Sequence, residues 1–177
     1  MSTRIVKAYD RDYVHYGSKI FDPELFKPVQ NNRFPRNKPG EGGLWASPVD
    51  AEYGWRDFCT NEAFHEDSLK QYFIFSLKEG SKIFELIDAS DLAEIPRLKP
   101  ETSAVGVYMP SLLKNIYPDF EEMVRQGYDA IVYEPKSGPG YEALHYGLYG
   151  WDVDCILILN SECMIMKKEA RKGGKDD

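Results

Sequence analysis

A histidine near the start of the chain is the first residue that could take part in chemistry. His15 lies in a run of strand-forming residues, 13–16, which Gly17 and Ser18 end. An imidazole at a strand end can hydrogen-bond a sugar hydroxyl, and a glycine lets a ligand approach the backbone closely. The alternative is an ordinary half-buried histidine before a turn.

A second segment concentrates aromatic side chains behind a glycine. Gly43 leads into a predicted strand at 44–48 that contains Trp45, and Tyr53 and Trp55 follow in a predicted helical turn. Aromatic faces placed in this way can hold a flat heterocycle between them. The alternative is that these rings are core residues, although the acids and glycine around Tyr53 favour a solvated phenol.

Two acids stand directly before a strongly apolar strand near the other end of the chain. Asp152 and Asp154 precede the predicted strand 155–159. A carboxylate at the mouth of a buried strand is costly unless it faces solvent or a ligand. Such a group can stabilise the positive charge that develops when a glycosidic bond breaks. The alternative is a pair of turn acids at a strand entrance.

The order and spacing of these three segments resemble the ADP-ribosyltransferase superfamily, in particular its His-Tyr-acid branch of diphtheria toxin and the poly(ADP-ribose) polymerases. Residues 127–132, GYDAIV, look like the Gly-Tyr-Asp-x-Ile strand of bacterial toxin and phage members. Residues 154–160, DCILILN, resemble the Glu-Tyr-Ile-Val-Phe-Asp strand of the same members. The resemblance extends over about residues 13–165.

The resemblance implies an enzyme, a bacterial or phage mono-ADP-ribosyltransferase of toxin or effector type. It would cleave the nicotinamide–ribose bond of NAD, its co-substrate, and transfer ADP-ribose to a protein or nucleic-acid acceptor. The catalytic residues that it implies are His15, Tyr53 and Asp154. The NAD-binding residues that it implies are His15, Gly17, Ser18, Gly43, Trp45, Ala46 and Tyr53. An NAD glycohydrolase on the same fold, or an inactive nucleotide-binding or interaction module, is the alternative.

The chain departs from the family pattern at two positions. The family has a glycine directly after the histidine, whereas Tyr16 intervenes here before Gly17. The acid is Asp154 where the family has a glutamate, which is one methylene longer. Asp152 and Glu162 are therefore alternative candidates for the acid.

The segment 135–150, which precedes the acid strand, is the predicted acceptor-binding loop. Related enzymes recognise the acceptor at this position. The aromatic and imidazole side chains in and directly after this segment are Tyr141, His145, Tyr146, Tyr149 and Trp151, of which Tyr146, Tyr149 and Trp151 are the predicted acceptor contacts. Such rings can stack on a base or contact a protein. The alternative is that they close over the core.

Patterns elsewhere predict the elements that position these residues. They are a loop at 27–43, a helix at 57–69, a hairpin of strands 71–77 and 82–87, a short helix ending at Glu94, a helix at 111–126 interrupted at Pro118, and a strand at 128–134. Strands and helices without strict βαβ alternation indicate an α+β fold with a mainly antiparallel sheet and flanking helices. The resemblance further implies a split sheet. We expect a single domain at 1–166 and a basic, disordered tail at 167–177.

Composition narrows the classes of partner. The net charge of −7 argues against a broad phosphate-binding surface, but it is compatible with a nucleic acid bound in a local groove. Three cysteines without Cys-x-x-Cys spacing fit a reducing cytoplasm and argue against a disulfide framework or a metal site. No signal peptide or membrane-spanning run is present in the 177 residues. The expectation is a cytoplasmic monomer that does not bind membranes.

Overall fold

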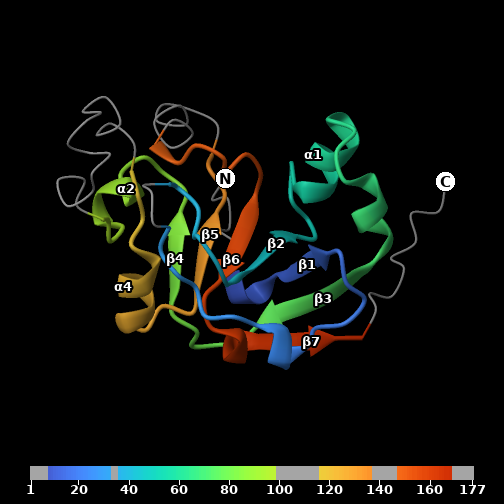
Figure 1. The fold of residues 1–177 in the computed structure, drawn as a ribbon, viewed down its shortest axis with the longest axis horizontal. Coiled ribbons are helices and arrows are strands. Elements are labelled where there is room, and N and C mark those ends of the chain that lie inside the picture. Colours follow the sequence, from blue (N-terminus) through green and yellow to red (C-terminus); the bar gives the residue numbers. More distant parts are fainter. Residues whose placement is uncertain (1–7, 33–35, 99–115, 137–146, 169–177) are drawn as a thin grey trace, which may run out of the picture.

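The computed structural model describes residues 8–32, 36–98, 116–136 and 147–168. These residues form an α+β fold with one open, mostly antiparallel sheet of seven strands and a few short helices (Figure 1). The predicted fold class is confirmed at this level.

The strands follow the order β4-β5-β6-β2-β1-β3-β7 across the sheet. Their bounds are β1 Asp12–Tyr16, β2 Leu44–Pro48, β3 Tyr72–Leu77, β4 Ile83–Leu86, β5 Ala130–Tyr133, β6 Cys155–Ile158 and β7 Met164–Lys167. All neighbours pair antiparallel except β4 and β5, which run parallel. The two central strands β5 and β6 are buried at every position, as their continuous apolar sequences predict.

The first two strands separate after a short stretch of pairing. Val14 pairs with Ser47, and Tyr13 with Pro48, but from His15 onward β1 pairs only with β3. The other end of β2 pairs with β6. The two halves of the sheet, β4-β5-β6 and β1-β3-β7, therefore meet at β2, and their strands run in clearly different directions in Figure 1.

The predicted hairpin of strands 71–77 and 82–87 is wrong. β3 lies between β1 and β7, whereas β4 is at the opposite edge of the sheet beside β5. Five of the six residues of β3 are buried, so this strand packs on both faces and has a neighbour on each side. A turn at Gly80, with φ +87°, reverses the chain without pairing the two strands that it joins.

The last strand was not predicted from the sequence. Lys167, which we assigned to the tail, is the final residue of β7, and its Nζ lies 2.5 Å from Asp12 Oδ1. β7 pairs with β3 along Met164–Lys167. Three of its four residues are exposed, although its sequence, MIMK, is largely apolar.

The helices are shorter than predicted. Their bounds are α1 Trp55–Asn61, α2 Asp91–Glu94 and α4 Phe120–Arg125, with short 3₁₀ helices at Ala8–Asp10, Pro23–Leu25, Glu66–Lys70 and Ser161–Cys163. The predicted helix 57–69 is interrupted because Ala63 and His65 adopt φ values of +48° and +50°. Ala63 and Phe64, at this interruption, are exposed.

The predicted helix 111–126 is confirmed only in its second half. α4 begins after Asp119, whose carboxylate accepts a hydrogen bond from the Glu122 amide at 3.0 Å. Residues 116–119 are not helical, because Pro118 lies in an extended bridge with Arg97. Residues 111–115 lie outside the described part. The helix stops at Gly127, as predicted.

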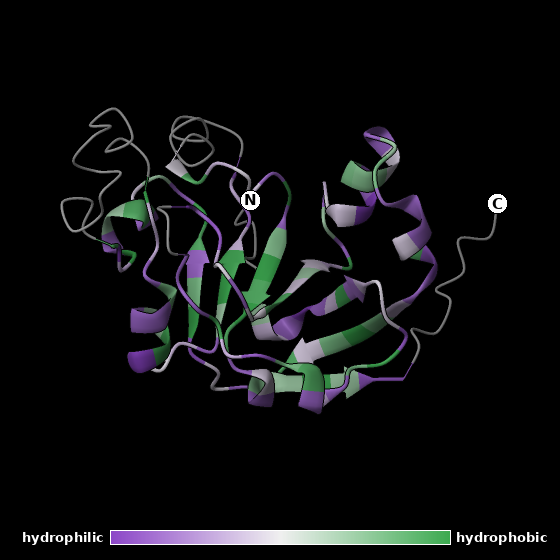
Figure 2. Ribbon diagram, in the orientation of Figure 1, coloured by the Kyte–Doolittle hydropathy of each residue, from purple (hydrophilic) through white to green (hydrophobic). Residues whose placement is uncertain are grey.

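Two apolar clusters cover the two faces of the sheet. One contains Leu157, Cys155 and Trp151 with α2 and α4 residues, and the other contains Ile156, Ile158 and residues of β1 and β3. Figure 2 shows the hydrophobic residues concentrated along the strands. In the described ranges, no helix has the length and apolar composition needed to span a membrane.

Candidate functional site

The imidazole of His15 bridges the two halves of the sheet where β1 and β2 part. Its Nδ1 lies 2.7 Å from the carbonyl oxygen of Trp45. A carbonyl oxygen only accepts, so Nδ1 carries the proton and Nε2 has a free lone pair. Burial lowers the pKa of His15, and the bond to Trp45 opposes this only in part. The ring is therefore neutral at pH 7, with Nε2 able to accept a hydrogen bond.

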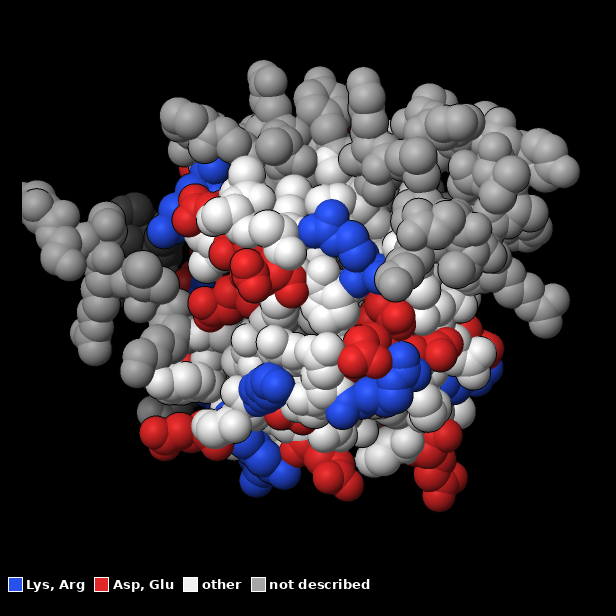
Figure 3. Space-filling model, turned by 90° about the vertical axis from the view of Figure 1, so that its left-hand side faces the viewer, with Lys and Arg blue, Asp and Glu red and all other residues white. Residues whose placement is uncertain are grey.

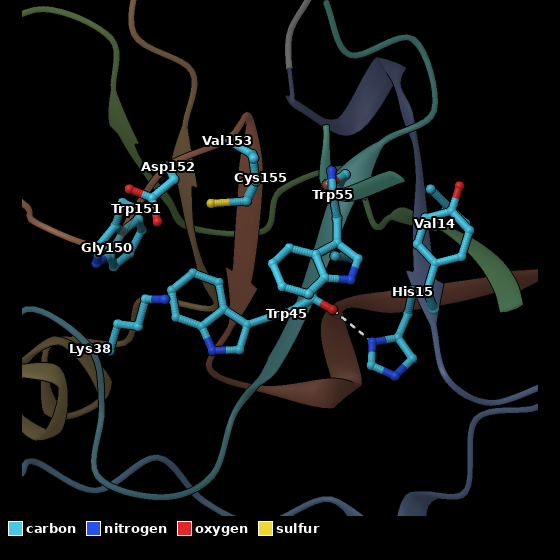
Figure 4. A pocket seen from close by; sticks show the side chains of 13 residues that line it. Val14, His15, Lys38, Trp45, Trp55, Gly150, Trp151, Asp152, Val153 and Cys155 are labelled. Atoms are coloured by element: carbon cyan, nitrogen blue, oxygen red, sulfur yellow. Dashed lines mark hydrogen bonds between the residues drawn. The ribbon is translucent and has the colours of Figure 1, made fainter. Parts of the chain in front are cut away.

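A pocket of about 310 Å³ opens beside this bridge. Its lining residues come from β1, β2, α1, the start of β6 and the loop before β2: Val14, His15, Tyr16, Lys38, Trp45, Ala46, Ser47, Trp55, Gly150, Trp151, Asp152, Val153 and Cys155. In Figure 4 the Trp45 indole extends towards Lys38, and the His15 imidazole lies beside the Trp45 carbonyl. The volume is within the range of small-ligand sites.

Hydrogen bonds fix the aromatic walls of the pocket. Trp151 is almost fully buried, and its Nε1 donates to the Asn37 carbonyl oxygen at 2.7 Å. Its ring meets Trp45 edge to face, with centroids 4.8 Å apart. Trp55 begins α1, and its amide donates to Ser47 Oγ on β2 at 2.9 Å. The pocket is therefore a preformed feature of the packed structure.

Charged groups of both signs lie at the pocket. Lys38 comes from the loop that we predicted at 27–43, and its Nζ lies 6.0 Å from the centre of the Trp45 ring. Asp152 lines the pocket and is exposed. A ligand that carries both a cationic ring and an anionic group would complement this pair of charges.

Asp154 and Tyr53 contact each other but do not line the pocket. The Tyr53 amide donates to Asp154 Oδ2 at 3.3 Å, and the Asp154 amide donates to the Tyr53 carbonyl at 2.9 Å. Burial raises the pKa of Asp154, and the Tyr53 amide partly opposes this. The Tyr53 ring is 37% exposed, and its hydroxyl accepts from Asn61 at 3.3 Å. The Asp154 carboxylate therefore holds the backbone of the segment before α1.

Asp154 lies in the bend that leads into β6. Val153 and Cys155 line the pocket, whereas the Asp154 side chain between them accepts from the Tyr53 amide. Asp152 precedes the strand and reaches the pocket. Glu162, the other alternative acid, is exposed in the 3₁₀ helix beyond the far end of β6.

The predicted glycines and Ser18 have local structural roles. Gly17 adopts φ +106°, and its amide donates to the Gln71 carbonyl at 2.8 Å. Gly43 adopts φ +71°, and a Cβ there would lie 2.8 Å from Leu157 Cδ1. Ser18 Oγ donates to the Ile20 carbonyl at 2.7 Å. None of these three residues lines the pocket, whereas Ala46 does.

The predicted acceptor residues divide into an exposed and a buried position. Tyr149 is 74% exposed, whereas Trp151 is 1% exposed and belongs to the core. Trp151 thus follows the alternative that these rings close over the core. Tyr146, Tyr141 and His145 lie outside the described residues.

Tyr16 and Lys38 are among the pocket residues that were not predicted from the sequence. Tyr16, which interrupts the family pattern, lines the pocket together with its neighbours Val14 and His15 at the end of β1. Lys38 lies in a Pro- and Gly-rich loop whose path the sequence pattern does not define. The position of Tyr16 directly after His15 at the strand end could have identified it, but no local signal marks Lys38.

Searches of protein-family models, curated proteins and solved structures found no match to this chain.

Proposed function

We propose that this chain is an NAD-dependent mono-ADP-ribosyltransferase whose site is the pocket beside His15. The main observation behind the proposal is that aromatic side chains, a neutral histidine and an acid line the same pocket. These are three of the residue types that the sequence resemblance to the superfamily implies. The parting of β1 and β2 at His15 and Trp45 supports it further, because residues of both strands line the pocket there.

The charges of the pocket suit the two ends of NAD. The nicotinamide ring is flat and cationic, and it would stack against the Trp45 indole near the Asp152 carboxylate. The diphosphate is anionic and would lie towards Lys38. The pocket of about 310 Å³ would hold the nicotinamide end, and the rest of the dinucleotide would extend along the surface.

The protein groups then have distinct roles in bond cleavage. Nε2 of His15 accepts a hydrogen bond from a ribose hydroxyl and orients the sugar. The Asp152 carboxylate stabilises the oxocarbenium-like charge that develops as nicotinamide leaves, an effect of about 2.7–4 kcal/mol in comparable electrostatic sites. Asp154 and Tyr53 act as positioning residues, since their contacts hold the segment that leads into Trp55. In this proposal Asp152 replaces Asp154 as the acid.

A second candidate is a module on the same fold that binds the nucleotide without cleaving it. It is favoured by the position of Asp154, because the residue that aligns with the family's acid is bonded to a backbone amide outside the pocket. If Asp152 does not replace it, the pocket would bind NAD and leave it intact.

One experiment separates these candidates and the NAD glycohydrolase alternative. The purified chain is incubated with NAD labelled on the adenylate, with and without a cell lysate, and free nicotinamide is measured in parallel. A transferase releases nicotinamide and labels a macromolecule, and a glycohydrolase releases nicotinamide without labelling one. A binding module retains intact NAD. Retention of intact NAD in the presence of lysate would overturn the proposed activity.

A further inference from the structure

A basic groove lies at the β3–β7 edge of the sheet. It measures about 360 Å³, and four lysines line it together with Tyr72 and two apolar residues: Lys19, Lys70, Lys167 and Lys168. None of its lining residues is acidic, although the whole chain has a net charge of −7. By contrast, the face that Figure 3 shows has acidic and basic side chains interspersed.

The basic groove adjoins the aromatic pocket through a pair of tyrosines. Tyr72 lines the groove and lies opposite Tyr16 in the β1–β3 ladder, with ring centroids 6.0 Å apart. Tyr16 lines the aromatic pocket. The next pair along the ladder, His15 and Phe73, also joins the two cavities, with ring centroids 4.9 Å apart. A chain lying in the groove would pass directly beside the pocket.

The lysines of the groove are available to an anion. Lys70 pairs with Asp67, but these side chains are 75% and 94% exposed. Lys167 pairs with Asp12 in a half-exposed contact. Exposed ion pairs of this kind contribute little, about 0–1 kcal/mol, so a phosphate can displace them at small cost. Lys19 and Lys168 are exposed as well.

We propose that the basic groove binds single-stranded nucleic acid. The lysines would contact successive phosphates, and the Tyr72 ring, which is 45% exposed, would stack on an unpaired base. A single strand fits better than a duplex, because a duplex needs a broad basic surface, which the net charge disfavours, and it keeps its bases stacked. The role of the bound strand as ADP-ribose acceptor depends on the proposed function. The binding of the strand to the groove does not depend on it.

Fluorescence anisotropy with dye-labelled oligothymidylate and oligouridylate of about twelve nucleotides tests the groove. We expect binding that weakens with salt. The triple variant Lys19→Gln, Lys70→Gln, Lys168→Gln should bind at least tenfold more weakly, and its salt slope should be smaller by about 2, since each single-strand phosphate contact contributes roughly 0.7. The matched control Lys27→Gln, Lys78→Gln, Lys136→Gln removes the same charge from exposed lysines outside the groove.

The stacking contact is tested by a pair of substitutions at one position. Tyr72→Ala should weaken oligonucleotide binding about tenfold or more, whereas Tyr72→Phe keeps the ring and should bind nearly as tightly as the wild type. Absence of oligonucleotide binding, or an equal loss in the groove triple and the control triple, would overturn the proposal. Transfer of the NAD label to protein alone, with the groove triple as active as the wild type, would overturn the acceptor role of the bound strand.

Calorimetry with NAD keeps the two proposals apart. The groove triple should bind NAD with wild-type affinity, because its lysines do not line the aromatic pocket. Loss of oligonucleotide binding with NAD binding retained supports the groove. If the wild type binds the oligonucleotide but not NAD, the proposed function fails and the groove proposal stands.

Discussion

The Nδ1 atom of His15 lies 2.7 Å from the carbonyl oxygen of Trp45, at the point where β1 and β2 separate. Beyond Val14 these two strands no longer pair, and the imidazole takes the place of a backbone partner for the Trp45 carbonyl. The bond orients the ring, fixes its tautomer and holds the strand that carries the Trp45 indole. The His15 side chain therefore both connects the two strands and lines the pocket.

Replacing His15 should weaken the binding of NAD. His15→Ala removes the acceptor Nε2 and leaves a ribose hydroxyl unpaired, which costs about 1–3 kcal/mol and corresponds to roughly five- to a hundredfold in affinity. Calorimetric titration of each protein with NAD measures the change in affinity. His65→Asn is the control, because His65 is exposed and Asn tolerates its left-handed backbone. Equal affinities of His15→Ala and the wild type would remove His15 from the site.

The two aspartates before β6 should differ in their effect on turnover. Asp152→Asn removes the carboxylate at the pocket and should lower the rate of NAD cleavage by about a hundredfold or more, with NAD affinity nearly unchanged. Asp154→Asn can still accept the hydrogen bond from Tyr53 and should retain most of the activity. Steady-state kinetics of nicotinamide release by the two variants and the wild type tests this difference. The reverse result would restore Asp154 as the acid.

Asp154 should make stability depend on pH in a defined direction. Burial raises the pKa of this carboxyl, so between its ordinary value, about 3.9, and the raised value the folded state binds more protons than the unfolded state. Its contribution to stability therefore falls as pH rises through that interval. Urea unfolding should show Asp154→Asn gaining stability relative to the wild type as the pH rises from about 4 through the raised pKa. A constant difference between the two proteins would show that the pKa is not raised.

The two aromatic residues around Gly150 should separate acceptor recognition from stability. Trp151→Phe leaves the Asn37 carbonyl without its donor and should lower the free energy of unfolding by about 1–3 kcal/mol. Tyr149→Ala alters an exposed ring and should change stability by less than about 0.5 kcal/mol. We expect it to reduce transfer to the acceptor and spare NAD hydrolysis. Equal loss of both activities would place Tyr149 in the NAD site.

The strands could be predicted because their signals are local. Residues 155–158 and 130–133 are continuous apolar runs, and both are buried strands of the sheet. Their partners could not be predicted in the same way. Turn chemistry at Gly80 suggested a hairpin, but β3 and β4 pair with strands far away in the sequence. Non-local pairing depends on the packing of the whole sheet, which no short segment encodes.

The candidate site was predictable in part for a similar reason. Trp45 and His15 were found from residue type and strand position, and both line the pocket. The choice between Asp152 and Asp154 depends on the path of the segment before β6, because residues two apart would share one face of a regular strand. Val153 and Asp154 form a bend instead, and the sequence pattern does not indicate that Asp152 lines the pocket and Asp154 does not. Lys38 reaches the pocket through tertiary packing of an irregular loop.

Nicotinamide release from NAD by the purified chain, with NAD binding measured on the same samples, tests the proposed activity most directly. We predict that the wild type binds NAD and releases nicotinamide, and that Asp152→Asn binds NAD with similar affinity but releases nicotinamide about a hundredfold more slowly. A folded wild-type chain that neither binds NAD nor releases nicotinamide, with or without a lysate as a source of acceptor, would contradict the proposal.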